Sequence, residues 1–447
     1  MSTTLRSVRR CFEGAVPAVI GTCATDLTPN IAYLSQVHYV DEQHVALSYQ
    51  FFNKTRENIL ANPRATLQVI DPESALHYRL HLEYLRTETA GPLFELMKVK
   101  LAGIASHTGM SKVFRLLGAD IYRVLRVEPV SGSLPVAPSQ RIDLLPGLRA
   151  AIGAIAGCGD MSALLDHVLT ALQQHFDVQH SMLLLYDAAQ QRLFTVASHG
   201  YADSGVGSEV CLGEGIIGVA AREHTPIRIG YAAQEYLYSR ATRTGFACSK
   251  DRDALETEIP FPGLEDSRSQ LAVPLLYRDR LTGVLFVESP RELRFTYEDE
   301  DALVVLAGQL ALELELMLRV DHHEVPEIPR AVSATVHGTP ANIRHFARDH
   351  SVFIDNAYLI KGVAGAILWT LLREYVDSGR TDFSNRELRH DRRLGLPDIT
   401  DNLEARLILL QRRLAERCSH LAIEKTGRGC FRLHVQRPVS LSEDPAE

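Results

Sequence analysis

The sequence has few of the features that hold small secreted or metal-bound folds together. Only 7 of its 447 residues are cysteine, and none forms a C-x-x-C pair, which argues against a disulfide framework or a zinc knuckle. No apolar run approaches the ~20 residues of a membrane-spanning helix. The early run at residues 15–20 is short, broken by Pro17 and lacks a cleavage-site flank, so we expect a cytoplasmic protein.

The composition is that of a folded chain with several domains. Hydrophobic residues make up 46% and charged residues 23%, which disfavours disordered, collagen-like and coiled-coil classes. A chain of 447 residues exceeds what one core usually supports, so two to four domains are expected. Net charge is −8, yet residues 343–437 carry 17 Lys+Arg against 12 Asp+Glu. This asymmetry fits a negatively charged partner at that end.

Two breaks divide the chain. Residues 131–146 are rich in proline, serine and glycine, and residues 321–342 are charged and interrupted by proline. The paired histidines His322 and His323 lie in the second break, where solvated side chains are expected, and we assign no metal site. The predicted fold class is multidomain α+β, with domains at residues 1–130, 147–320 and 343–437, and an acidic tail at 438–447 that we expect to fray.

The first segment is predicted to be a small β-barrel. Short β-type runs at residues 18–24, 31–40, 44–49 and 65–70 are separated by turn residues. Along them, Ser35-Gln36-Val37, Ser48-Tyr49 and Lys54-Thr55-Arg56 resemble the FMN-binding split barrel of the pyridoxamine 5′-phosphate oxidase-like family, over about residues 10–130. The N-terminal domain is therefore expected to be a split β-barrel.

This resemblance implies a cofactor site. Lys54, Thr55 and Arg56 would hold a phosphate, since a helix start with an ammonium and a hydroxyl suits a dianion. The remaining implied contacts border the ring of FMN or a related flavin or haem-type cofactor, usually across a homodimer interface: Ser35, Gln36, Val37, Ser48 and Tyr49. The alternative is that these cations are solvated at an exposed helix start. The substrate motif of the true oxidase is missing, so no catalytic residue is assigned.

The middle segment is expected to be an α/β sandwich. A helix over residues 148–176 is followed by strand-like runs at 181–186, 193–198, 270–275 and 281–288. Together with Gly213-Glu214-Gly215-Ile216-Ile217-Gly218, their order and spacing are similar to a GAF domain over residues 147–320. These glycines are interpreted as a tight turn into a helix rather than a nucleotide loop, because the surrounding dinucleotide-binding pattern is missing.

The GAF resemblance implies a ligand pocket beside an insertion at about residues 230–268. An apolar or planar small-molecule effector would meet residues of this insertion, for which the alternative is ordinary packing: Tyr236, Tyr238, Phe246 and Cys248. Cys248 and Cys211 are either redox-sensitive thiols or small packing residues. Apolar residues at positions 303, 307, 310, 314 and 317 form either a seam between two subunits or a face buried against the domain's own sheet.

The C-terminal segment ends in a basic helix and a hairpin. Strands at residues 352–355 and 358–360 precede an amphipathic helix at 367–375, a helix cap near residues 381–388, a basic helix at 401–414 and a glycine-tipped hairpin at 423–433. This order resembles the winged helix-turn-helix of OmpR/PhoB-type response regulators, whose recognition helix enters the major groove of double-stranded DNA. The alternatives are a solvated charged face and a winged helix that binds protein.

The resemblance implies specific DNA contacts. Residues near the start of the basic helix would meet base edges, and the others would meet the DNA backbone: Asn402, Glu404 and Arg406, then Arg412, Arg413, Lys425 and Arg428. The sequence thus predicts a one-component transcriptional regulator that senses a small molecule or redox cofactor and binds DNA as a homodimer. The alternative is a flavin-dependent oxidoreductase in which the GAF and winged-helix domains are regulatory.

Overall fold

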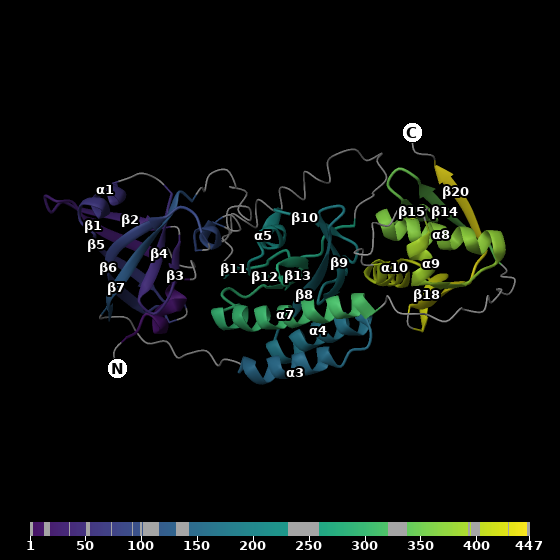
Figure 1. Cartoon of the computed structure of the whole chain (residues 1–447), viewed down its shortest axis with the longest axis horizontal. Helices are drawn as coiled ribbons and strands as arrows, with labels where there is room; N and C mark the ends of the chain where they lie inside the picture. Colours follow the sequence, from purple (N-terminus) through teal and green to yellow (C-terminus); the bar gives the residue numbers. More distant parts are fainter. Residues whose placement is uncertain are drawn as a thin grey trace.

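Three domains follow one another along the long axis of the molecule in the computed structural model (Figure 1). The N-terminal domain lies at one end, a central domain lies in the middle, and the C-terminal domain lies at the other end. Among the residues described, no helix is long and apolar enough to cross a membrane. The structure describes residues 3–12, 18–34, 36–50, 54–72, 74–91, 93–98, 101, 116–130, 143–230, 259–320, 338–391, 394, 403–427 and 429–444.

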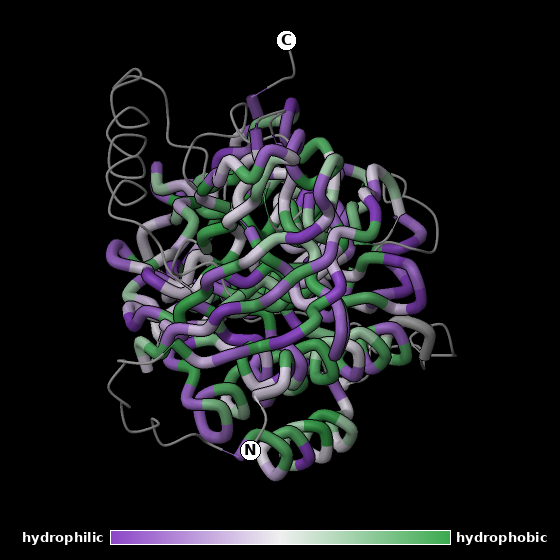
Figure 2. The backbone as a smooth tube through the Cα atoms, turned by 90° about the vertical axis from the view of Figure 1, so that its left-hand side faces the viewer, coloured by the Kyte–Doolittle hydropathy of each residue, from purple (hydrophilic) through white to green (hydrophobic). Residues whose placement is uncertain are grey.

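The N-terminal domain is built on one half-barrel sheet of seven antiparallel strands, in the order β2-β1-β5-β6-β7-β4-β3. Its core contains Leu67, Leu80, Leu82 and Tyr122. Figure 2, which views the molecule from this end, shows hydrophilic and hydrophobic residues interleaved along the strands, as expected when one sheet face is buried. Its elements are η1 (Arg6–Phe12), β1 (Ala18–Cys23), β2 (Pro29–Leu34), β3 (Val37–Tyr39), β4 (His44–Tyr49), α1 (Lys54–Ala61), β5 (Arg64–Ile70), β6 (His77–Glu88) and β7 (Gly118–Pro129).

The central domain has a six-stranded antiparallel sheet, in the order β10-β9-β8-β13-β12-β11, with helices on both faces. Alternate residues of β8 separate the two cores: Leu183 packs with α3, α4 and α7, whereas Leu184 packs with α5. The strands are β8 (His180–Asp187), β9 (Arg192–His199), β10 (Glu209–Cys211), β11 (Ile227–Ile229), β12 (Ser269–Tyr277) and β13 (Arg280–Ser289). The helices are α3 (Leu144–Ala156), α4 (Met161–Phe176), α5 (Gly215–Glu223) and α7 (Tyr297–Val320).

Two expectations for the central domain change. The helix predicted over residues 148–176 is two helices, because Gly157 ends α3 and the Asp160 side chain caps α4 by accepting from the Ser162 amide. On α7, Leu303, Leu310 and Leu314 are buried against the domain's own core. This outcome selects the second of the two alternatives for that row of residues.

The C-terminal domain has two small sheets around three helices. One sheet has the order β16-β15-β14-β20 and the other β17-β19-β18. The helix cap predicted near residues 381–388 is Ser384 at the start of α9, where it forms a capping box: Ser384 and Glu387 each accept from the other's backbone amide. The elements are β14 (Ala341–Phe346), β15 (Ser351–Ile354), β16 (Ala357–Ile360), α8 (Gly362–Ser378), β17 (Asp382–Ser384), α9 (Asn385–His390), α10 (Leu403–Arg417), β18 (Leu421–Gly427), β19 (Cys430–Val435) and β20 (Val439–Asp444).

The prediction that the acidic tail frays is wrong for residues 439–444. Strand β20 pairs in parallel with β14, and Arg344 donates to Asp444 at 2.7 Å. The polar alternation of this strand conceals it in the sequence, because one of its faces remains exposed. The C-terminal domain therefore extends from Ala341 to Asp444 rather than over residues 343–437.

Candidate functional site at the junction of the central and C-terminal domains

Helix α10 is the element that joins the two domains. It contacts α8, β16 and β18 of its own domain, and also α4 and β9 of the central domain. Four consecutive apolar residues, Leu407–Leu410, cover a full turn of this helix, so it is buried on more than one side although other positions are charged. The buried residues are Leu403, Ala405, Arg406, Leu407, Ile408, Leu409, Leu410, Arg413 and Leu414.

Arg406 forms the most buried of the described ion pairs across the junction. Its guanidinium bonds to the carboxylate of Asp187 at the end of β8 and lies 4.1 Å from the ring centroid of Phe194 on β9. Only 9% of the Arg406 side chain and 6% of the Asp187 side chain are exposed. Asp187 also accepts from the backbone amides of Ala189 and Gln190, so its position is fixed before Arg406 arrives.

Three further ion pairs cross the same boundary. Arg412 meets Asp166 at 2.7 Å. Lys425 of the hairpin meets Asp160 at 3.5 Å and Glu404 of its own domain at 3.1 Å. Lys361, immediately before α8, meets Glu209 on β10 at 3.6 Å.

In each of these four described pairs the C-terminal domain supplies the cation and the central domain supplies the carboxylate. Charge composition agrees with this arrangement. Residues 147–320 carry 14 Lys+Arg against 24 Asp+Glu, whereas residues 343–437 have the opposite excess. The acidic face of the central domain is therefore complementary to the C-terminal domain.

Arg413 has a different role. It is buried within the C-terminal domain, where it donates to the carbonyl oxygen of Leu359 at 3.1 Å and meets Glu416 at 3.4 Å. Burial lowers the pKa of Arg413, although Glu416 opposes this shift. This side chain holds β16 against α10 and is not presented to a partner.

The predicted DNA-binding set is thus divided by the fold. Glu404, Arg406, Arg412 and Lys425 lie together at the junction, and Arg413 is buried beside them, with its Cδ atom 3.9 Å from the position of a Cβ at Gly207 of the GAF domain. Asn402 and Arg428 fall outside the described residues. No sequence pattern indicates Asp187 or Phe194, because their role depends on a contact between domains. The opposite net charges of residues 147–320 and 343–437 are the sequence feature that points to this contact.

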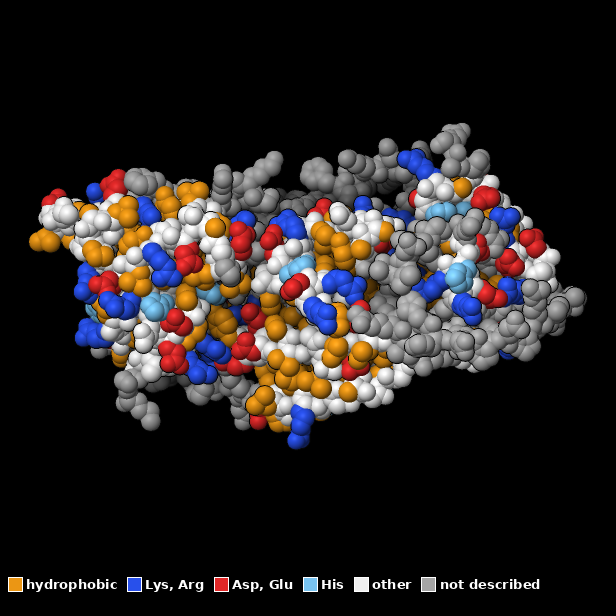
Figure 3. Space-filling view, in the orientation of Figure 1, with side chains coloured by type: hydrophobic (Ala, Val, Ile, Leu, Met, Phe, Trp, Pro, Cys, Tyr) orange, Lys and Arg blue, Asp and Glu red, His pale blue; other side chains and the backbone are white. Residues whose placement is uncertain are grey.

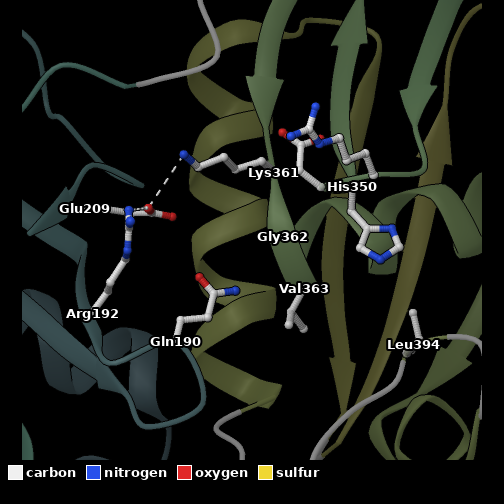
Figure 4. A pocket seen from close by; sticks show the side chains of 10 residues that line it. Gln190, Arg192, Glu209, His350, Lys361, Gly362, Val363 and Leu394 are labelled. Atoms are coloured by element: carbon white, nitrogen blue, oxygen red, sulfur yellow. Dashed lines mark hydrogen bonds and ion pairs between the residues drawn. The ribbon is translucent and has the colours of Figure 1, made fainter. Parts of the chain in front are cut away.

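A cavity of about 580 Å³ opens beside these contacts (Figure 4). Gln190, Arg192 and Glu209 of the central domain line one side, and the segments around His350 and Lys361 line the other. Glu209 accepts from Arg192 at 3.0 Å and faces Lys361. The cavity is therefore lined by charged side chains from both domains.

The predicted phosphate-binding residues of the N-terminal domain lie in two different environments. Lys54, at the start of α1, is exposed and meets Glu57 at 3.2 Å, and the Thr55 hydroxyl accepts from Asn30 at 2.9 Å. Arg56 instead turns toward the sheet, where it pairs with Asp120 at 2.5 Å. Lys54 and Thr55 are the two residues that remain suited to a phosphate.

The residues expected around a cofactor ring lie on neighbouring strands. Ser48 accepts from the Gln36 amide at 3.2 Å, Val37 is in the core, and Tyr49 lies 4.6 Å from the Arg56 guanidinium. Among the described residues, none gives the buried side-chain oxygen of Gln36 a hydrogen bond, which fits a site for a polar group. Ser35 falls outside the described residues.

The predicted effector residues of the central domain, Tyr236, Tyr238, Phe246 and Cys248, all lie outside the described residues. The glycine-rich segment before α5 is a tight turn, as expected: Gly213 has φ +84°, and a Cβ at Gly218 would lie 2.2 Å from the carbonyl oxygen of Cys211. This close approach explains the glycines without a nucleotide.

Comparisons with solved structures give matches that each cover part of this chain. The GAF domain of an Acinetobacter phosphoenolpyruvate-protein phosphotransferase is 24% identical, with 39% of this chain and 95% of that chain covered and a TM-score of 0.31. The fRMsr of Staphylococcus aureus, solved with its substrate, is 20% identical, with coverages of 39% and 97% and a TM-score of 0.30. An FMN-binding protein from Syntrophomonas wolfei subsp. wolfei is 18% identical, with coverages of 28% and 86% and a TM-score of 0.25.

No curated protein sequence matches this chain. The GAF domain family, in contrast, matches residues 160–314. This range runs from the cap of α4 to the middle of α7 and includes all six strands of the central sheet. The central domain is a GAF domain.

Proposed function

We propose that the protein is a one-component transcriptional regulator in which the GAF domain senses a small molecule and controls a DNA-binding C-terminal domain. The observation that carries this proposal is the set of four ion pairs in which GAF carboxylates engage cations of the C-terminal domain. Cations that meet carboxylates here are equally suited to phosphates of nucleic acid. Sensor and nucleic acid would then compete for the same side chains.

The order of elements supports a winged-helix output domain. Helix α10 is followed by the β18–β19 hairpin, and β17 completes a three-stranded sheet with it. In the docked arrangement Arg406 is buried and α10 is covered by the GAF domain, so this helix is unavailable to a DNA groove. The regulator must therefore exchange between a docked, inactive state and a released state, and an effector would shift the populations.

We further propose that the N-terminal domain holds FMN or a related flavin or haem-type cofactor. Lys54 and Thr55 at the start of α1 would take the phosphate, and Gln36 and Ser48 would lie beside the ring. The cofactor would supply redox or light-absorbing chemistry, and the chain's own residues would only bind and orient it.

A homodimer is part of the proposal. Hydrophobic side chains gather along the lower edge of the GAF domain in Figure 3, where Figure 1 places α3 and α7. On α7, Val304, Val305, Leu312 and Leu316 form an exposed row, and they are 41%, 52%, 37% and 47% exposed. A second copy of this helix would bury such a row.

DNA retention by the full chain tests the proposal. Asp187→Asn weakens docking while keeping an oxygen for the amides of Ala189 and Gln190, so this variant should bind duplex fragments more tightly than the wild type. In that background Arg412→Gln should weaken binding and flatten the dependence of log K on log salt, whereas Arg149→Gln on α3 should not. If neither the wild type nor the Asp187→Asn variant retains DNA in dilute buffer, the DNA-binding function is refuted.

One observation favours a second candidate function, a C-terminal domain that binds only protein. Leu409 of α10 packs near Gly207 of the GAF domain, with its Cδ1 atom 3.5 Å from the position of a Cβ there. A recognition helix released into water would expose this apolar surface. In that case Asp187→Asn would increase binding to a protein partner and leave DNA retention at zero.

A further inference from the structure

The junction cavity is lined by more cationic side chains than carboxylates. Glu209 already meets both Arg192 and Lys361, and Asp349 accepts from the backbone amide and the hydroxyl of Ser351 at 3.0 and 2.7 Å. Arg348 is exposed, and no hydrogen bond or ion pair to another described residue engages its guanidinium. Its five N–H donors are therefore available in the cavity.

A chain of ring hydrogen bonds sets the state of His350, which also lines the cavity. Nδ1 of buried His345 lies 3.0 Å from a carboxylate oxygen of Glu443, and its Nε2 lies 3.2 Å from Nδ1 of His350. Burial lowers the pKa of His345, although the hydrogen bond to Glu443 opposes this, so the neutral ring is favoured at neutral pH.

These contacts fix the tautomers. The carboxylate of Glu443 can only accept, so Nδ1 of His345 carries the proton and its Nε2 accepts. Nδ1 of His350 must then donate, which leaves the lone pair of the neutral His350 ring on Nε2. A proton added at Nε2 would turn His350 into a further cation of the cavity.

Backbone geometry adds to this arrangement. His350 has φ +57°, a left-handed conformation that is uncommon for a residue with a side chain. The amide of Gly362, at the start of α8, donates to the carbonyl oxygen of Asp349 at 2.9 Å and so holds this turn against the helix. The N-terminus of α8 also contributes positive potential to the cavity wall.

We propose that this cavity binds a small phosphorylated molecule, with Arg348, Lys361 and His350 of the C-terminal domain and Arg192 of the GAF domain as its phosphate ligands. A volume of about 580 Å³ exceeds the size of a phosphate group alone. Val363 and Leu394 supply an apolar wall for the organic part. Because its ligands come from both domains, the bound molecule stabilises the docked state and hence the inactive regulator; this last step rests on the proposed function.

His350 contributes to the site through its Nε2 atom. The charged groups that face it are Arg348 and Asp349 beside it, Lys361 before α8, the His345–Glu443 pair behind it, and Arg192 and Glu209 across the cavity. A phosphate oxygen shares a proton with Nε2, so His350 adds a hydrogen bond to those from the arginine and lysine side chains.

Calorimetric titration of the full chain, without DNA, tests the site with inorganic phosphate, phenyl phosphate and benzoate. Phenyl phosphate should bind most tightly, and Arg348→Gln should weaken it by at least about tenfold, since a charged hydrogen-bond donor is lost. Arg149→Gln removes the same charge from exposed α3 and should leave affinity unchanged. The proposal is overturned if no probe binds, if benzoate binds as tightly as phenyl phosphate, or if the two arginine variants behave alike.

His350→Asn provides the second readout. Asparagine tolerates the left-handed backbone and can still donate to His345, so the fold should be kept. Asparagine has no atom where Nε2 of His350 lies, so the variant should bind phenyl phosphate more weakly than the wild type at a fixed pH. Unchanged affinity in the variant would remove His350 from the site. Because DNA is absent from these titrations, their failure leaves the DNA-binding proposal standing, and the reverse also holds.

Discussion

The guanidinium of Arg406 is held between the carboxylate of Asp187 and the ring of Phe194, so this buried cation of α10 is neutralised by the GAF domain. Its Nε atom has no hydrogen-bond partner in the described structure. The stability of this buried cation therefore depends on the carboxylate of Asp187. A nearby pair, Arg412 with Asp166, offers a comparison because 63% of the Asp166 side chain is exposed.

Asp187→Asn should loosen the docking of α10. Removing one charge of a buried pair leaves the other without compensation, which typically costs about 3–5 kcal/mol. We expect a lower urea midpoint and faster hydrogen exchange in the amides of α10. The local turn should survive, because an asparagine oxygen still accepts from Ala189 and Gln190.

Asp166→Asn is the matched control. Its pair with Arg412 is largely solvated, so the same change should cost less than about 1 kcal/mol. Equal losses in the two variants would show that burial of Arg406 does not stabilise the docked arrangement.

The sequence predicted much of each domain but not their contact. The strands at residues 18–23, 44–49 and 64–70, the capping box at Ser384 and the tight turn at Gly218 are all encoded locally, by alternation, a cap and a close approach. The partner of Arg406 is 219 residues away, and no periodicity indicates it. Arg406 was predicted at the output surface for its charge, and that charge is also what suits it to Asp187.

The exposed row on α7 predicts the oligomeric state. Leu312→Glu places a charge in the middle of this row, so a dimer formed through it should dissociate, as measured by sedimentation equilibrium. Val376→Glu makes the same change on α8, where Val376 is 50% exposed, and should have no effect. A dimer that persists in the Leu312→Glu variant would place the interface elsewhere, and a wild-type monomer would refute the homodimer.

The contact between the N-terminal and GAF domains should weaken at low pH. Partial burial raises the pKa of Glu298 on α7, but its hydrogen bonds with Arg9 (2.5 Å), Thr296 and its own backbone amide outweigh this and lower the pKa to about 2. A carboxylate whose pKa is lower in the folded protein than in the unfolded chain stabilises the fold at pH values above its unfolded-state pKa. This stabilisation is lost as the pH falls toward about 2.

Glu298→Gln should remove this acid-dependent part of the stability. Thermal unfolding between about pH 5 and pH 2 should show a smaller loss for this variant than for Glu292→Gln, whose pair with Arg268 lies on the same domain. Parallel curves for the two variants would mean that Arg9 and Glu298 do not couple the domains.

Arg56 is predicted to stabilise the N-terminal sheet rather than to hold a phosphate. Its partner Asp120 is buried, and burial raises the pKa of that carboxyl, although hydrogen bonds from Thr87 and Arg56 oppose the shift. Arg56→Gln leaves Asp120 buried without a cation, so the free energy of unfolding should fall by about 3–5 kcal/mol at neutral pH.

The pH dependence of this loss distinguishes the two roles of Arg56. A carboxyl whose folded pKa lies above its unfolded value destabilises the fold as the pH rises, and losing Arg56 raises the folded pKa of Asp120 further. The loss in Arg56→Gln should therefore be larger at about pH 8 than at pH 5 in urea unfolding. Arg79→Gln, which breaks an exposed pair with Glu128, should show a small loss at both pH values. If Arg56→Gln is as stable as Arg79→Gln but no longer retains flavin, Arg56 belongs to the phosphate site instead.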